Sequence, residues 1–162
     1  MGTNMFRVIY PTMIRSHMEH AVQFWSPHLN KDIDKLEKVQ RRATRSVPEL
    51  KHLPYAERLK RLGLTTLEQR RLRGDLIEMF KIIKGFENVD RKQFFTLATD
   101  DPQHYDTRGH MYKIVPPHAH TTRRKSFFDI RTIHTWNKLP VYVIACNTVD
   151  NFKIKLDLYF KR

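Results

Sequence analysis

The sequence predicts a mainly α-helical fold, an irregular helical bundle with at most a short β-hairpin around residues 108–123. Apolar residues recur at steps of three and four along several stretches, and Pro or Gly ends most of them. A short β-prone run at residues 111–115 is stopped by Pro116. Hydrophobic residues make up 40% of the 162 positions, which is enough to bury a core and argues against a wholly disordered chain.

The first predicted helix covers residues 5–25 and is interrupted near Pro11. Proline lacks an amide donor and disfavours a helical residue before it, so a break or kink is expected there. After it, apolar residues form one face that ends with Trp25. His17 and His20 have a spacing that metal ligands use, but no carboxylate or cysteine pattern completes a site, so packing or surface histidines are favoured.

The second helix is predicted to begin after an N-cap at Asn30 and to end at Pro48, and it combines an apolar edge with a basic face. The apolar edge consists of Ile33, Leu36, Val39, Ala43 and Val47. The basic face consists of Lys31, Lys35, Lys38, Arg41, Arg42 and Arg45. Acidic residues in the first turn and arginines in the last complement the helix dipole, so a solvated charged face explains part of the pattern. As a group, the cations favour phosphate contact.

A short helix at residues 55–62, closed by Gly63, precedes the longest helical pattern of the chain, which runs to Lys84. Thr65 and Glu68 have the spacing of a capping box at its start. The predicted buried stripe of the long helix consists of Leu72, Leu76, Met79, Phe80 and Ile83. Three cations near its N-terminal end oppose the helix dipole, which indicates a ligand or an acidic neighbour: Arg70, Arg71 and Arg73.

The Asp100-Asp101 pair invites comparison with the metal site of polymerases. That site needs two apolar strands flanking the turn, whereas here Thr99 precedes the pair and Pro102 follows it. The comparison is therefore rejected.

A second basic cluster follows the β-prone run and consists of Arg123, Arg124 and Lys125, with few acids near it. It fits either a loop that orders on a polyanion or a merely solvated loop. His118 and His120, just before it, are a weak metal signal. A helix from Ser126 to Asn137 and a last helix capped by Thr148 complete the predicted elements.

The composition is strongly basic, with a net charge of +13 and a pI near 10.1. Such a chain most often meets nucleic acid, while ribosomal, chromatin or anionic-membrane contacts are competing interpretations. No apolar run approaches the roughly 20 residues of a membrane helix. The single cysteine, Cys146, excludes an internal disulfide and favours an intracellular protein, nuclear or cytoplasmic. We find no catalytic constellation, no metal site and no phosphate loop, so no cofactor is expected.

The order of the motifs resembles the C-terminal region of reverse transcriptases from non-LTR (LINE-type) retrotransposons, in the jockey-like and chicken-repeat-like group. The resemblance covers about residues 10–160, and its motifs are Ile14–Glu19, Ala21–Pro27, Leu36–Thr44, Tyr55–Leu59, Leu62–Leu64, Leu67–Leu76, Thr107–His110, Phe127-Phe128, Trp136–Pro140 and Phe152-Lys153. It implies a helical, thumb-like segment that follows the catalytic palm and holds template and primer. The palm with its metal-binding aspartates and the endonuclease are absent, and His20 stands where the family usually has an aromatic residue, so polymerase activity is not expected.

This resemblance implies four segments: a divergent leader at residues 1–9, a thumb-like helical region at 10–86, a loop-rich basic connector at 87–125 and a C-terminal helical pair at 126–162. The expected partners are an RNA template and a DNA primer, bound through their phosphates, and the rest of a full-length reverse transcriptase. The expected contacts are Lys38, Arg41, Arg42, Arg45, Arg70, Arg71 and Arg73, with Arg123, Arg124 and Lys125 second. The alternatives are a basic scaffold that binds acidic protein and a decayed remnant without a selected activity. If the chain folds stably, Trp25 and Trp136 should both be buried.

Overall fold

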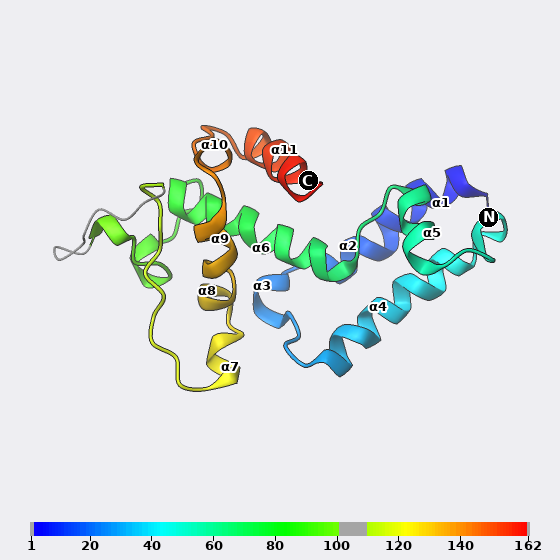
Figure 1. Ribbon diagram of the computed structural model, residues 1–162, viewed down its shortest axis with the longest axis horizontal. Helices are drawn as coiled ribbons and strands as arrows, with labels where there is room; N and C mark the ends of the chain where they lie inside the picture. Colours follow the sequence, from blue (N-terminus) through cyan, green and yellow to red (C-terminus); the bar gives the residue numbers. More distant parts are fainter. Residues whose placement is uncertain (1, 101–109, 162) are drawn as a thin grey trace. The chain divides into compact units, whose positions relative to one another are not determined.

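A computed structural model describes residues 2–100 and 110–161, and it confirms the mainly helical fold (Figure 1). Within these residues the β-structure amounts to one isolated antiparallel bridge, between Leu97 and Ile114. Residues 110–123 thus contain no hairpin, and residues 108–109 lie outside the described part of the chain. The chain divides into two compact units, Met1–Gly74 and Asp75–Arg162.

The first unit contains α1 (Thr3–Ile9), η1 (Tyr10–Arg15), α2 (Ser16–Glu19), α3 (Val22–Trp25), α4 (Asn30–Arg45), η2 (Pro48–Leu50), α5 (Tyr55–Leu62) and the start of α6 (Leu67–Lys84). The second contains the rest of α6, then η3 (Arg91–Gln93), η4 (Ala98–Asp100), α7 (Thr122–Lys125), α8 (Phe128–Arg131), α9 (Ile133–Lys138), α10 (Val141–Ile144) and α11 (Val149–Phe160). The four segments implied by the resemblance stay a prediction.

At the predicted interruption near Pro11, the chain changes from an α-helix to a π-helix. From Tyr10 to Arg15 the backbone is a π-helix, with Pro11 in its first turn, where its missing amide costs no hydrogen bond of that segment. The Thr12 hydroxyl donates to the carbonyl oxygen of Val8 at 2.8 Å and so satisfies an acceptor near the proline. The helical path therefore continues through the proline, and the turn comes later, at Ala21, whose φ of 49° is left-handed.

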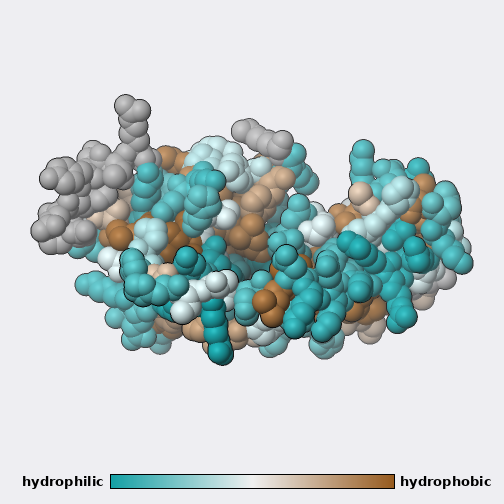
Figure 2. All heavy atoms as spheres, turned by 60° about the horizontal axis from the view of Figure 1, so that its bottom comes forward, coloured by the Kyte–Doolittle hydropathy of each residue, from teal (hydrophilic) through white to brown (hydrophobic). Residues whose placement is uncertain are grey.

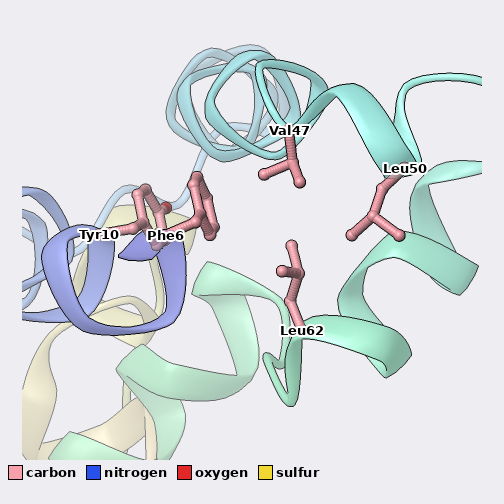
Figure 3. Packing of buried hydrophobic residues seen from close by; sticks show 5 residues of the cluster. All are labelled: Phe6, Tyr10, Val47, Leu50 and Leu62. Carbon is pink, nitrogen blue, oxygen red and sulfur yellow. The ribbon is translucent and has the colours of Figure 1, made fainter. Parts of the chain in front are cut away.

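The hydrophobic core of the first unit joins η1 to the segments that follow α4. The rings of Phe6 and Tyr10 stack with their centroids 5.0 Å apart. They pack with Val47, Leu50 and Leu62, as Figure 3 shows. All five side chains are almost fully buried, so this cluster fixes the ends of α4 and α5 against the first helices.

The core of the second unit is built on α6 and α11. Four of the five residues predicted as the buried stripe of α6 are confirmed as buried (Leu76, Met79, Phe80 and Ile83), while Leu72 is half-buried. The ring of Phe80 stacks on that of Phe152 from α11 at a centroid distance of 4.1 Å. Stacked aromatic rings of this kind contribute beyond the area they bury.

The dipeptide Trp136-Asn137 of α9 holds the segment around Ile114. The Trp136 indole nitrogen donates to the carbonyl oxygen of Tyr112 at 2.8 Å. The Asn137 side chain accepts from the amide of Ile114 at 3.0 Å and donates to its carbonyl oxygen at 2.8 Å. The Asn137 side chain thus bonds both backbone groups of Ile114, as a paired strand would.

Several local predictions are confirmed. Gly63 closes α5 with φ of 67°, and the Thr148 hydroxyl caps α11 by accepting from the amide of Asn151. The expectation for Trp136 is also confirmed, because its side chain is fully buried.

Other local predictions are wrong. Trp25 is 39% exposed, and its indole nitrogen donates to the backbone carbonyl oxygen of His20 at 2.6 Å. The capping box of α6 lies one residue later, where Thr66 and Gln69 bond reciprocally. Asn30 is the first residue of α4 and not its cap. The single helix predicted from Ser126 to Asn137 is two short helices, α8 and α9.

Candidate nucleic-acid interface

The buried face of α4 is polar. The helix buries Glu37, Gln40 and Thr44, whereas Val39 of the predicted apolar edge is 44% exposed. Of that edge, Val47 alone is fully buried, and it lies beyond the end of the helix. The predicted apolar edge is therefore buried only in part: Ala43 packs against the core cluster, Ile33 and Leu36 are half-buried, and the fully buried positions within the helix are polar.

Gln40 is the centre of these hydrogen bonds. Its side-chain oxygen accepts from the Tyr10 hydroxyl at 2.9 Å, and its nitrogen donates to the Tyr55 hydroxyl at 2.9 Å and to the Thr65 carbonyl oxygen at 3.0 Å. A single buried amide thus connects α4 to η1, to α5 and to the residues before α6. Buried polar groups that are fully bonded specify one arrangement of their partners.

Glu37 extends this network by one turn. It accepts from the Tyr55 hydroxyl through one oxygen and from the amide of Leu67, the first residue of α6, at 3.0 Å through the other. A carboxylate at a helix N-terminus is favoured by the helix dipole. Because Glu37 is turned inward, its negative charge is withdrawn from the outer face of α4.

The outer face of α4 carries six exposed cations. We call these the α4 basic face: Lys31, Lys35, Lys38, Arg41, Arg42 and Arg45. Lys35 pairs with Asp32 at 3.2 Å. Within residues 2–100 and 110–161, no carboxylate pairs with Lys38, Arg41, Arg42 or Arg45. Figure 2, with the lower side of Figure 1 turned forward, shows a mostly hydrophilic surface over α4 with isolated hydrophobic side chains.

Arg58 on α5 is a cation next to this face that the sequence reasoning missed. Its side chain is buried, with 4% exposed, and its guanidinium lies 5.5 Å from the centroid of the Tyr55 ring. The guanidinium of Arg41 lies 5.1 Å from the centroid of the same ring. A signal was present, because Arg58 lies three residues after Tyr55 and four before Leu62, at the spacing of one face of α5.

The three arginines predicted near the start of α6 differ from the α4 basic face. Arg70 forms two hydrogen bonds to Glu19, at 2.9 and 2.7 Å, so the acidic neighbour considered for it is present. Glu19 also pairs with Arg15 at 3.2 Å. Burial lowers the pKa of Arg15, and the charge of Arg70 lowers it further. Arg71 is buried, with 4% exposed. Arg73 is half-buried.

The second predicted cluster lies on α7, in the other unit. Arg123 and Lys125 are exposed. Arg124 donates to Asp129 at 2.6 Å, and its guanidinium lies 5.3 Å from the centroid of the Phe127 ring. Two of the three cations thus remain open to solvent, while the third stabilises the turn into α8.

Asp100 takes part in local contacts. It bonds to Arg91 at 2.6 and 3.2 Å and accepts from the amide of Leu97 at 3.0 Å. The hydrogen bond from Arg91 lowers the pKa of the Asp100 carboxyl. Asp101 lies outside the described residues.

His118 and His120 are exposed, with Nδ1 of the first 3.1 Å from Nε2 of the second. In the described part of the chain, no group of three or more His, Cys, Asp or Glu residues could hold a metal ion. Over the same residues, no helix is both long enough and apolar enough to cross a membrane.

Comparison of the chain with protein-family models, with curated proteins and with solved structures gave no significant match.

Proposed function

We propose that the protein binds the sugar–phosphate backbone of nucleic acid through the α4 basic face, as a thumb-like segment related to non-LTR reverse transcriptases. The observation that carries this proposal is the set of exposed cations on α4 without a carboxylate partner among the described residues. The motif order of the sequence supports the family assignment. Exposed cations without a carboxylate partner contribute more free energy to binding a polyanion than cations that are already paired within the protein.

The dimensions of the helix fit a run of phosphates. Lys31 and Arg45 are 14 residues apart on α4, which corresponds to about 21 Å along the helix axis. One strand of a duplex carries a phosphate every 3.4 Å along its axis, so this length faces roughly six nucleotides. Phosphate contacts position a nucleic acid without reading its sequence, so the proposed binding has no base specificity.

The hydrogen bonds inside the first unit support the same proposal. They hold α4 through its inner face, and Lys38, Arg42 and Arg45 on its outer face take no part in them. A rigid helix that presents cations loses little conformational entropy when it binds.

The test is the salt dependence of binding to a primed RNA–DNA hybrid, measured with the full chain by fluorescence anisotropy. The variant replaces Lys31, Lys38 and Arg42 by Gln, which removes three cations from one stripe of α4. Since each phosphate contact contributes roughly 0.7–0.9 to the slope of log K against log salt, the slope should fall by roughly two to three.

The matched control replaces the exposed lysines Lys92, Lys138 and Lys161 by Gln and lowers the net charge by the same three units. It should leave the slope within one unit of that of the unaltered protein. Equal slopes in the two variants would refute the assignment to α4, because they would mean that total charge alone drives binding. Heparin as competitor separates the proposed role from general polyanion binding: selective retention of the hybrid is expected, and equal displacement by heparin contradicts a thumb-like role.

A further inference from the structure

We infer that Arg41, Arg45 and Arg58 form a binding site for one phosphate group, with Arg58 as its buried, preoriented donor. This inference rests on the proposed function and deepens it, because it separates one specific phosphate position from the general attraction of the α4 basic face.

Arg58 is a buried cation held by neutral groups. Its Nε donates to the Thr44 hydroxyl at 3.2 Å and its Nη1 donates to the Leu53 carbonyl oxygen at 2.7 Å. Among the described residues no carboxylate contacts its guanidinium. Burying a charge costs free energy unless an opposite charge accompanies it, so a guanidinium in this setting has a strong electrostatic preference for an anion.

Two further arginines increase this preference. Arg41 lies at the same Tyr55 ring as Arg58, and Arg45 follows Thr44, the residue whose hydroxyl accepts from Arg58. Burial lowers the pKa of Arg58, and the charges of Arg45 and Arg41 lower it further. Like charges brought together destabilise the free protein. A phosphate between them converts that repulsion into attraction, which is the usual physical basis of an arginine-lined anion site.

The unused donors of Arg58 remain open. Its Nη2 has no hydrogen-bond partner within residues 2–100 and 110–161. Among these residues, the polar side-chain atoms that are both fully buried and without a hydrogen bond are the two ring nitrogens of His110. Because Nη2 of Arg58 is unbonded and is not among them, it keeps some access to solvent. A guanidinium has five N–H donors in a fixed plane, and two are used by Thr44 and Leu53.

The chemistry favours a phosphate over a carboxylate. Three guanidinium groups from two helices offer donors in more than one plane, and a tetrahedral oxyanion presents oxygens in more than one plane, whereas a carboxylate is flat. The phosphate is either an internucleotide diester or a terminal monoester of the bound strand, and both have the same oxygen geometry.

The first experiment follows thermal unfolding and calorimetric binding of inorganic phosphate to the full chain, with sodium chloride at matched ionic strength as reference. Phosphate should raise Tm more than chloride does. The variant Arg41→Gln/Arg45→Gln, which alters exposed side chains only, should weaken phosphate binding by roughly tenfold to a hundredfold, because a hydrogen bond to a charged group contributes about 1.5–3 kcal/mol.

The matched control is Lys38→Gln/Arg42→Gln, with the same charge change on the same helix, and it should retain phosphate binding. Arg58→Lys keeps the charge but loses the planar donor pair, so it should fold and lose most of the phosphate effect. Equal stabilisation of the unaltered protein by phosphate and chloride would overturn the inference, as would equal losses in the two double variants.

Oligonucleotides with a 5′-phosphate or a 5′-hydroxyl then identify the source of the phosphate. If the occupant is a terminal monoester, the 5′-phosphate should strengthen binding, and Arg41→Gln/Arg45→Gln should abolish that gain. If it is an internucleotide diester, the variant should weaken both oligonucleotides equally. Unchanged binding of both would contradict the site. The proposed function can fail separately, since its test alters Lys31, Lys38 and Arg42 and leaves the three arginines in place.

Discussion

Replacing Gln40 by Leu should lower the free energy of unfolding of the first unit by about 3 kcal/mol. Gln40 is fully buried and makes three side-chain hydrogen bonds, each of which contributes about 1 kcal/mol net. The substitution also leaves the buried Tyr10 hydroxyl without its acceptor, at a cost of about 1–3 kcal/mol. The apolar surface that Leu buries offsets about 1–2 kcal/mol of this loss.

The assay is urea unfolding of the full chain followed by far-UV circular dichroism; Trp25→Phe in every variant leaves Trp136 as the tryptophan whose fluorescence reports the second unit. The midpoint of the first unit should fall, while the transition reported by Trp136 stays in place. Val39→Ala is the control on the same helix, and its 44% exposure predicts a change below about 0.5 kcal/mol.

A double-mutant cycle with Tyr10→Phe tests the cause. Because Tyr10 and Gln40 share one hydrogen bond, the two losses should be non-additive by about 1 kcal/mol. A loss below 1 kcal/mol for Gln40→Leu, or strict additivity with Tyr10→Phe, would refute the view that buried polar contacts hold α4.

Three further predictions concern buried charges and ionisable groups. Asp75→Ala should destabilise the second unit by about 3–5 kcal/mol in urea unfolding, because the substitution removes a buried carboxylate that accepts two hydrogen bonds of 2.9 Å from Arg131. Burial raises the pKa of Tyr10 and of Tyr55 in the folded state, so stability should be retained below pH 10 and lost above it, by up to about 1.4 kcal/mol per pH unit for each tyrosine, as measured by unfolding at a series of alkaline pH values. Burial lowers the pKa of His110, so below about pH 6.5 the unfolded state takes up a proton that the folded state resists, and the second unit should lose stability on acidification; His110→Gln should flatten that dependence.

Each of these has a control or a contradicting result. Asp150→Ala removes an exposed ion pair with Lys153 and should cost less than about 0.5 kcal/mol, and an equal cost for Asp75→Ala would contradict the first prediction. Tyr142→Phe alters a half-exposed phenol and should leave the alkaline loss unchanged. The third prediction fails if His110→Gln keeps the full acid dependence.

The sequence predicted those features of the fold that depend on residues close together in the chain. Gly63 ends α5 through its own left-handed backbone, and Thr148 caps α11 by accepting from an amide three residues later. Both roles could be predicted from the sequence. The stripe of α6 was also readable, because apolar residues buried against other apolar residues keep the helical period.

The buried face of α4 could not be predicted from the sequence, because the partners of its side chains lie far away along the chain. The side chain of Gln40 finds partners in Tyr10, Tyr55 and Thr65, which lie 30, 15 and 25 residues away. A polar residue on a basic helix looks solvated until such partners are known. The apolar period of α4 therefore misidentified the inner face by about one residue at each turn, with Glu37 and Gln40 taking positions assigned to Leu36 and Val39.

The same distinction applies to the candidate interface. Exposure of the α4 cations follows from the helical period, whereas the pairing of Arg70 with Glu19, 51 residues away, required the structure. Arg58 occupies a position on the buried face of α5 where the helical period predicts an apolar residue, so the sequence itself marks it as a cation in an apolar position.

The inward placement of Glu37, Gln40 and Thr44 makes α4 modular. One set of side chains determines which segments of the chain assemble, and a separate set determines what approaches from outside. Outer residues that make no contact with a neighbouring element, such as Lys31, Lys38 and Arg42, can be replaced or reversed in charge at little cost in folding. A family of such variants on one scaffold would show how affinity for a polyanion depends on charge pattern alone.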